Sequence, residues 1–407
     1  MARILFSGGK VFDGSGADPV AADLVVEGDR IVEIGAGLHG PEQVVDCTGM
    51  TLLPGLIDCH VHVTVSDVTI KSRVENPFSY QFYQAAQNLA RTLAVGITTV
   101  RDAAGADLGI KKAVEDGLIP GPRMQIAVSM VSQTGGHGDG WMPSGLCLPL
   151  GVPHPGRPSG IADGPAEIRK VAREILRAGA DVIKVATTGG VLSPTDDPRH
   201  TQLTPAELEV LVTEAAMQGR YVMAHAQGTE GIKNAVRAGI RSIEHGIYLD
   251  DEAIELMLAN GTWLVPTLVA PVSVIRAAQA GASVPESAVR KSKEVIEVHV
   301  DSVRRAVAAG VKIAMGTDSG VGPHGTNLDE LPLMAGCGMS PGQVLAATTS
   351  SAAELLGYGD QFGRLATGYR ADLAIVAGDA YELNHLAANV SQVWKNGQLV
   401  ARDGQLV

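Results

Sequence analysis

The segment GLIDCHVHVT, residues 55–64, contains two histidines one residue apart in an otherwise apolar, strand-like sequence. Because side chains two residues apart on a β-strand point to the same face, His60 and His62 would present their imidazoles in one direction. A pair arranged in this way can chelate a metal ion. It can also be a pair of core histidines satisfied by hydrogen bonds, and the motif alone leaves both interpretations open.

Further residues that could bind a metal lie at the ends of other apolar, β-branched runs: Lys184, His225, His245 and Asp318. Imidazole nitrogens and carboxylate oxygens bind Zn2+ at about 2.0–2.2 Å, and catalytic zinc keeps one position open for water. Each residue alone has a structural alternative, since a strand histidine can be satisfied within a core and Asp318 in GTDSG could cap the next helix. The whole set, at the ends of successive strands, predicts one shared metal site.

Lys184 is the unusual member of this set, because it is a cation flanked by Ile183 and Val185. Burial and two nearby dications would both disfavour its ammonium form, so its pKa should fall. A neutral amine can add CO2 to give a carbamate, which could bridge two metals about 3.5–4 Å apart. The alternative is a lysine on the outer face of the fold or paired with an acid.

The elements that must position these side chains alternate between strands and helices. Between residues 52 and 320 we find eight apolar or β-branched runs, at 52–63, 96–105, 123–130, 181–190, 220–228, 241–249, 262–270 and 311–320. Segments with helical periodicity lie in most of the gaps, including 165–180, 204–219 and 286–310. This order predicts a (β/α)8 TIM barrel over residues 58–345, with its active site at the carboxyl ends of the strands.

The two ends of the chain have a different texture, with short strands interrupted by glycine. Neither end is large enough to bury a two-faced sheet alone. We therefore expect residues 1–57 and 346–407 to pair into one small β-sandwich built from both termini, which makes the protein an α/β barrel with a composite second domain.

Composition limits the classes of partner. The net charge is −12 and no cluster of Lys and Arg occurs, which argues against a nucleic-acid partner. No apolar run is long enough for a membrane span, and the apolar run at the N-terminus is too short for a signal-peptide core. We therefore expect a cytoplasmic protein that does not bind membranes. The four cysteines form no C-x-x-C pair and suggest neither a disulfide framework nor a cysteine zinc site.

These residues together resemble the binuclear-metal type of the amidohydrolase superfamily. Its pattern consists of an H-x-H pair on strand one, a carboxylated lysine, two further histidines and an aspartate on strand eight. The matching residues here are His60, His62, Lys184, His225, His245 and Asp318. The resemblance implies that His60, His62 and Asp318 hold the more buried of two divalent ions, that His225 and His245 hold the more exposed one, and that carbamylated Lys184 bridges them. We expect both ions to be Zn2+.

Within the superfamily, the segments TGGHGD (134–139), TTGGVLSPTDDP (187–198) and IEHGIYLDDEAI (243–254) resemble the branch of Xaa-Pro dipeptidases and carboxypeptidases, with imidazolonepropionases as more distant relatives. Some relatives in this branch cleave aryl amides, including ochratoxin, and urea herbicides. The resemblance assigns His137 to the substrate carboxylate. The dipeptidase relatives carry Tyr where this chain has Gln227, whose amide can still donate a hydrogen bond to the scissile carbonyl.

We therefore expect a metal-dependent hydrolase of C–N amide bonds acting on a small-molecule amide or peptide substrate, with Asp318 and Lys184 as catalytic residues. Asp318 would take a proton from a water activated between the metals and return it to the leaving amine. The first expectation is a dipeptidase or carboxypeptidase acting on Xaa-Pro or N-acyl amino acid substrates. The alternatives are a hydrolase of aryl amides, carbamates or ureas, an imidazolonepropionase-like cyclic amidohydrolase, and a non-catalytic binding barrel. A homo-oligomer is compatible with all four.

Overall fold

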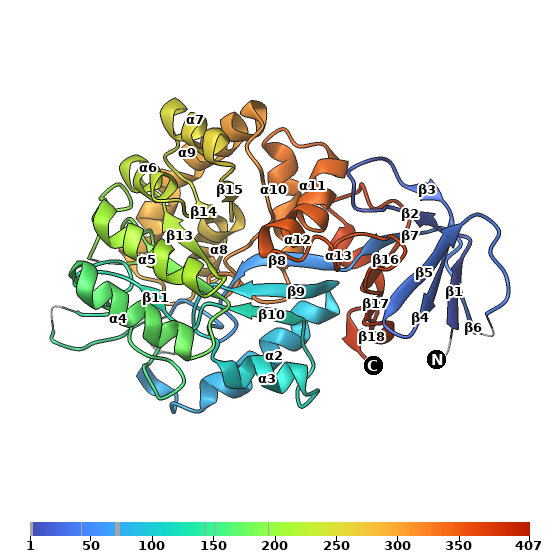
Figure 1. Cartoon of the computed structure of the whole chain (residues 1–407), viewed down its shortest axis with the longest axis horizontal. Coiled ribbons are helices and arrows are strands. Elements are labelled where there is room, and N and C mark those ends of the chain that lie inside the picture. The colour runs from blue at the N-terminus through green and yellow to red at the C-terminus, as the bar shows by residue number, and fades with distance from the viewer. Residues whose placement is uncertain (1–2, 42, 70–73, 143, 150, 194) are drawn as a thin grey trace.

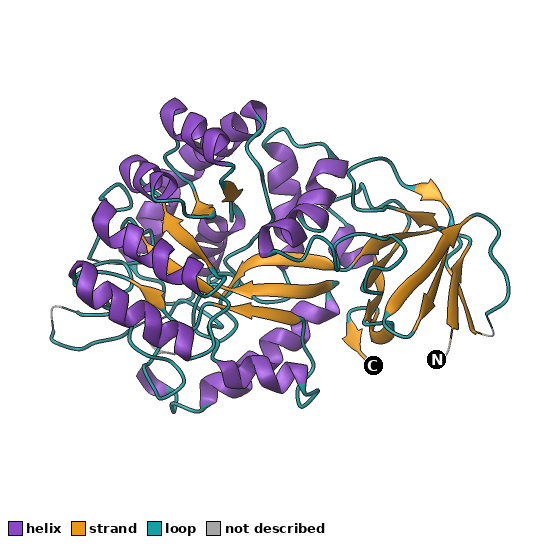
Figure 2. Ribbon diagram, viewed as in Figure 1, coloured by secondary structure: helices purple, strands orange, loops and turns teal. Residues whose placement is uncertain are grey.

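The computed structural model describes residues 3–41, 43–69, 74–142, 144–149, 151–193 and 195–407. Figure 1 shows a helix-covered barrel joined to a β-sheet part in which the strands nearest both ends of the chain lie. Figure 2 shows the same division by secondary structure, with helices arranged around the barrel strands. The predicted architecture, a (β/α)8 barrel with a terminal β-sheet part, is confirmed.

Parallel strands from the middle of the chain form two arcs of the barrel, in the orders β10-β9-β8 and β11-β12-β13-β14-β15. Asp181 donates a backbone hydrogen bond of 2.8 Å to Ile126 and so joins the arcs. The strands are β8 (Leu56–Val61), β9 (Ile97–Asp102), β10 (Arg123–Ile126), β11 (Met130–Val131), β12 (Val182–Ala186), β13 (Tyr221–Ala226), β14 (Ser242–His245) and β15 (Trp263–Val265).

The eighth predicted run, residues 311–320, closes the barrel as an extended segment. It makes only some of the backbone hydrogen bonds that a regular parallel strand would make with its two neighbours. Leu264 in β15 donates to Lys312 at 2.8 Å, and on the opposite side Cys59 in β8 donates to Met315 at 2.9 Å. Asp318 also donates from its backbone to His60 at 2.7 Å. The last residues of this segment therefore lie directly beside the histidine-bearing strand.

The first predicted run, 52–63, is wrong as a single strand. Gly55 divides it into β7 (Met50–Pro54), which pairs in the terminal sheet, and β8, which begins the barrel. A Cβ atom at Gly55 would lie 2.2 Å from the Thr98 hydroxyl oxygen, so the chain can pass between the two sheets at this point only without a side chain.

The helices expected at 165–180, 204–219 and 286–310 are confirmed as α4 (Gly164–Arg177), α5 (Pro205–Met217) and α9 (Glu286–Ala309). Gly310 ends α9 in the left-handed region, with a φ of 86°, where glycine costs least. The remaining helices are α2 (Tyr80–Ala94), α3 (Leu108–Glu115), α6 (Thr229–Arg237), α7 (Asp251–Asn260), α8 (Val269–Gln279), η1 (Asn327–Asp329), α10 (Glu330–Gly336), α11 (Pro341–Ala347), α12 (Ser350–Leu356) and α13 (Leu386–Asn389). None of the helices in the described ranges is long and apolar enough to cross a membrane.

Both ends of the chain contribute to the terminal sheets. One sheet has the order β5-β4-β1-β6, and the other has the order β19-β18-β17-β16-β7-β2-β3. The rings of Phe6 and Trp394 meet edge to face in the apolar core between them, with centroids 5.0 Å apart. The exact bounds, 1–57 with 346–407 against 58–345, stay a prediction. The strands are β1 (Arg3–Ser7), β2 (Lys10–Val11), β3 (Val20–Ala21), β4 (Asp23–Glu27), β5 (Arg30–Gly35), β6 (Gln43–Asp46), β16 (Leu373–Ala377), β17 (Val390–Lys395), β18 (Gln398–Arg402) and β19 (Gln405–Leu406).

Candidate metal centre

A cavity of about 380 Å3 opens at the carboxyl ends of the barrel strands. All the site residues expected from the sequence line it: His60, His62, His137, Lys184, His225, Gln227, His245 and Asp318. The fold thus brings together side chains from five of the eight predicted runs and from the loop after β11. Convergence of this kind is expected where parallel strands end at one rim of a barrel.

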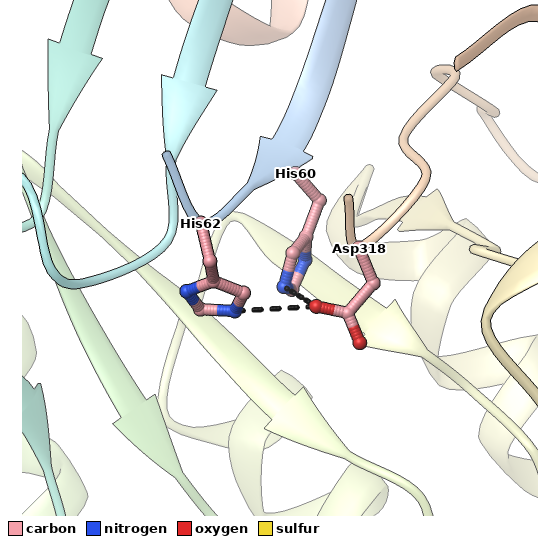
Figure 3. A group of neighbouring side chains, drawn as sticks. All are labelled: His60, His62 and Asp318. Carbon is pink, nitrogen blue, oxygen red and sulfur yellow. Dashed lines mark ion pairs between the residues drawn. The ribbon is translucent and has the colours of Figure 1, made fainter. Parts of the chain in front are cut away.

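The closest group within the cavity consists of His60, His62 and Asp318, whose potential ligand atoms all lie within 4.8 Å of one another. Figure 3 shows both imidazoles pointing toward the carboxylate. The Asp318 Oδ1 atom lies 3.4 Å from His60 Nε2 and 3.2 Å from His62 Nε2. Two imidazole nitrogens and a carboxylate oxygen in this arrangement are a donor set that suits a divalent ion such as Zn2+.

The other ring nitrogen of each of these two histidines is already occupied. His60 Nδ1 lies 2.7 Å from a carboxylate oxygen of Glu244, and His62 Nδ1 lies 2.8 Å from the carbonyl of Ala104. Since those oxygens can only accept, each Nδ1 is a donor, and the Nε2 atom that faces Asp318 is the nitrogen of each ring that could bind a metal. Histidines that bind a metal are usually oriented in this way.

His225 on β13 and His245 on β14 also have one ring nitrogen bonded to a protein group and the other available. His225 Nε2 donates to the Gly189 carbonyl at 3.0 Å, which leaves Nδ1 for a ligand. His245 Nδ1 lies 2.6 Å from the Thr267 hydroxyl, which leaves Nε2. The His245 ring centroid is 4.8 Å from that of His225 and 5.1 Å from that of His60. The second histidine pair therefore lies beside the first group, with one nitrogen of each ring available.

Burial and neighbouring charges together set the protonation states of His225, His245 and Asp318. Burial lowers the pKa of both His225 and His245 well below the ordinary value, so both rings are neutral near pH 7. Burial alone would raise the pKa of Asp318, but the neighbouring His60 and His62 outweigh it and hold that pKa well below the usual range. The site thus contains neutral imidazoles at His225 and His245 and an ionised carboxylate at Asp318. Burial would lower the pKa of His62, but the facing Asp318 outweighs burial and raises it.

Lys184 is almost completely buried, and within the described parts of the chain its amine forms no hydrogen bond or ion pair. Burial lowers the pKa of Lys184 to about 8, although Glu244 and Asp318 act in the opposite direction. An unpaired buried ammonium is costly. A side chain in this position suits a neutral amine or its carbamate, as the sequence predicted, and the carbamate itself stays a prediction.

Left-handed backbone conformations turn several side chains into the cavity. His245, Thr267 and Asp318 have φ values of 74°, 51° and 59°, a region that non-glycine residues seldom adopt. At the end of β14 this turn allows Glu244 to contact His60 inside the barrel while its neighbour His245 reaches the rim. Strand alternation alone would have sent these two side chains to opposite faces.

The sequence interpretation missed the buried pair formed by Glu244 and Arg101. Arg101 donates to the second Glu244 oxygen at 2.9 Å, and Ser242 donates to the same oxygen. Burial would raise the pKa of Glu244, but the guanidinium of Arg101 and then His60 outweigh it and lower that pKa to about 2. The detectable signal was a charged residue inside two apolar runs, in TTVRD and SIEHG. The buried ion pair with Arg101 holds Glu244 in place, and Glu244 in turn orients the His60 ring by accepting a hydrogen bond from its Nδ1 atom.

Comparison with known proteins gives the family. The sequence pattern of the amidohydrolase family matches residues 51–402. The chain belongs to the amidohydrolase family. It is 35% identical over 420 residues to ochratoxinase from Aspergillus niger, covering 97% of this chain and 86% of the relative. The crystal structure of that ochratoxinase superposes with a TM-score of 0.85.

Two other relatives of this amidohydrolase come from the branches expected from the sequence. A crystal structure of a Xaa-Pro dipeptidase with bound methionine has a TM-score of 0.89 and 34% identity, covering 98% of this chain and 99% of that one. An imidazolonepropionase from Cereibacter sphaeroides is 27% identical over 396 residues, covering 89% of this chain and 90% of the relative. The expected resemblance is confirmed. The protein is an amidohydrolase enzyme in which His60, His62 and Asp318 could hold a divalent metal ion, and the interpretation as a non-catalytic barrel is set aside.

Proposed function

We propose that this amidohydrolase cleaves aryl amides of the ochratoxin type. The observation that carries the proposal is the likeness to ochratoxinase, which extends over 97% of the chain at 35% identity. A likeness of this extent includes the barrel, the loops that form the cavity and the terminal sheets. It therefore favours the aryl-amide alternative over the dipeptidase that the sequence motifs placed first.

The residues that line the cavity favour a substrate with an apolar acyl group. Phe78 and Trp141 line the cavity with about half of each residue exposed, and a flat ring could stack on either of them. Ile247 and Val274 also line the cavity and are almost completely buried. A volume of about 380 Å3 lies within the range of pockets for small organic ligands.

We assign the chemistry to residues already in place. His60, His62 and Asp318 would hold one divalent ion, His225 and His245 a second, and carbamylated Lys184 would join them, with Zn2+ as the proposed metal. Such ions supply a Lewis acid and lower the pKa of bound water. Asp318 would accept a proton from the attacking water and return it to the leaving amine.

Gln227 is suited to hold the scissile carbonyl. Its side chain is about 5% exposed and lines the cavity, and its Oε1 atom has no hydrogen-bond partner among the described residues. A carboxamide whose polar end is not engaged by the protein can orient its N–H toward a substrate oxygen. We propose that Gln227 performs the role for which the dipeptidase relatives carry Tyr.

The second candidate is a dipeptidase acting on Xaa-Pro or N-acyl amino acid substrates. It is favoured by the TM-score of 0.89 to the Xaa-Pro dipeptidase structure, which extends over 98% of this chain. The two candidates share the same bond type and differ in the acyl side of the substrate.

A substrate panel separates these candidates. Purified enzyme supplied with Zn2+ should hydrolyse N-benzoyl-L-phenylalanine with a kcat/KM at least about tenfold above those for N-acetyl-L-phenylalanine and for Xaa-Pro dipeptides. A difference of this size corresponds to the contact of one buried aromatic acyl ring. An aryl carbamate, a phenylurea and a cyclic imidazolone complete the panel. A preference for Xaa-Pro substrates would establish the second candidate, and absence of hydrolysis across the panel would contradict both.

A further inference from the structure

One buried arginine joins three segments beside the cavity. Arg157, in the loop after β11, is 2% exposed. Its guanidinium donates to the backbone carbonyl of Val152 at 3.1 Å in the same loop, and to that of Gly105 in the loop after β9. It also donates to the side-chain oxygen of Gln81, at the start of α2, at 2.8 Å. Because a guanidinium is a rigid planar fork of donors, it holds these three segments in one arrangement.

Gln81 extends this restraint to Phe78, which lies just before α2. The Gln81 oxygen accepts from Arg157, and its amide nitrogen donates to the Phe78 carbonyl at 2.9 Å. Phe78, Gln81 and Val152 all line the cavity, whereas Arg157 does not. The arginine therefore connects two parts of the cavity wall without lining the cavity itself.

His154 makes a second connection between the same segments through its ring. The ring centroid lies 5.4 Å from that of Phe78 and 5.9 Å from that of Phe82, and both contacts are edge to face. The Nε2 atom is 3.8 Å from the Asp107 carboxylate and has no hydrogen-bond partner among the described residues. Burial and then Arg157 lower the pKa of His154 and outweigh Asp107, so the ring is neutral near pH 7. The imidazole therefore serves here as a flat ring that packs against Phe78.

His154 and Arg157 belong to one tight turn, because each donates a backbone hydrogen bond to the other, at 3.0 and 2.8 Å. We propose that both are positioning residues that hold Phe78 in the cavity wall, and that the wall so formed selects a flat aromatic acyl group over a small aliphatic one. The proposal rests on the function proposed above and assigns residues to its preference for aryl amides. His154 and Arg157 act through Phe78, since neither lines the cavity.

Holding Phe78 in place matters because its ring is about half exposed. The contact with His154 and the hydrogen bond from Gln81 limit the conformations of Phe78 before a substrate binds. A ring that is already ordered loses little conformational entropy when an acyl ring stacks on it. The contact of two aromatic rings is worth up to about tenfold in affinity. An acetyl group has no ring to stack, so its binding should depend little on how Phe78 is held.

The test compares variants of the turn with a matched control. R157K keeps the positive charge, but one ammonium cannot reach all three acceptors of Arg157 together. H154A removes the ring that packs on Phe78, and H154F is the conservative variant that restores a flat ring. R290K is the control, because Arg290 is 62% exposed and pairs with Glu294 at the surface. The substrates are N-benzoyl-L-phenylalanine and N-acetyl-L-phenylalanine, and melting temperature and metal content are measured in each sample.

Wild type should prefer the benzoyl substrate by at least about tenfold in kcat/KM. We expect R157K and H154A each to lower that preference by about three- to tenfold, the range for one aromatic contact, through a higher KM for the benzoyl substrate. The kcat/KM for the acetyl substrate should change by less than about twofold, and R290K should match wild type with both substrates. H154F should keep the preference within about twofold of wild type, because its ring packs on Phe78 as the imidazole does.

A double variant tests whether Arg157 acts through Phe78. R157K combined with F78A should lose no more of the benzoyl preference than F78A alone. Losses that multiply in the double variant would overturn the proposal, and so would equal losses for both substrates or an unchanged preference in R157K and H154A. H154A and H154F alter the ring contact without changing the guanidinium, so they can reject the proposal even if R157K does not fold.

Binding measurements separate this proposal from the proposed function. N-phenylsulfonyl-L-phenylalanine and N-methylsulfonyl-L-phenylalanine carry the same two kinds of acyl-side group on a bond that resists hydrolysis. By titration calorimetry, wild type should bind the phenyl compound about three- to tenfold more tightly than the methyl compound, and H154A should lose most of that preference while H154F keeps it. This result would hold even if neither benzoyl nor acetyl substrate were hydrolysed, an outcome that would contradict only the proposed function. Equal affinity of wild type for the two sulfonamides would reject the role of His154 and Arg157 whatever the enzyme cleaves.

Discussion

Replacing Asp318 with asparagine should lower turnover by about two to four orders of magnitude, the usual share of general acid–base catalysis. Asparagine keeps the size and hydrogen-bonding capacity of the side chain but cannot accept a proton from water. Asp318 is ionised and therefore able to accept a proton, because His60 and His62 hold its pKa well below the usual range against the effect of burial. The measurement is steady-state kcat on the best substrate of the panel.

The control for Asp318→Asn must separate lost basicity from lost metal. Elemental analysis of the same sample should show metal content close to that of wild type. Asp329→Asn removes a carboxylate that pairs with Arg276 at the surface and should leave turnover within about twofold of wild type. Wild-type turnover in Asp318→Asn would remove Asp318 from the proton transfer, and a matching loss of metal would make it a ligand only.

Lys184→Ala should abolish nearly all activity, by about three orders of magnitude or more, because it would remove the ligand that we propose both ions share. The variant should also lose most of its bound metal. Its melting temperature should not fall by much more than a lost side chain explains, because the amine of Lys184 has no partner among the described residues. Short carboxylic acids such as acetate could restore part of the activity by occupying the bridging position.

Lys170→Ala, on the exposed face of α4, serves as the matched control and should behave as wild type. The carbamate can be observed independently of activity, since wild type prepared with 13C-labelled bicarbonate should show a carbamate carbon resonance that Lys184→Ala lacks. Wild-type metal content and turnover in Lys184→Ala would make the lysine purely structural.

Strand periodicity and the rule that barrel sites lie at strand ends predicted much of this structure. His60 lies on β8 and His62 directly follows the end of that strand, and a local pattern of this kind is visible in the sequence. The same rule placed Lys184 and Asp318 at the same rim, where the cavity is found. The alternation of strands and helices was enough to predict the fold class, because the hydrophobic periodicity of each segment indicates whether it is a strand or a helix.

The contacts that the sequence could not predict depend on where distant segments meet. Gly55 interrupts the first run because the approach of Thr98 leaves no space for a side chain. His245 and its neighbour Glu244 both face the inside of the barrel, because the backbone turns left-handed at His245. The contact between Asp196 and His137 joins two loops 59 residues apart in sequence, and no local pattern encodes such a pairing. A cytoplasmic location and a homo-oligomer stay predictions.

The most direct test of the central claim is the metal content of fully active protein. The four oriented histidines, Asp318 and the unpartnered Lys184 predict close to two equivalents of divalent metal per chain by elemental mass spectrometry, with zinc as the expected element. Activity should fall with metal content during chelation and return when Zn2+ is restored. Full turnover in a preparation with one equivalent or none would contradict the binuclear centre.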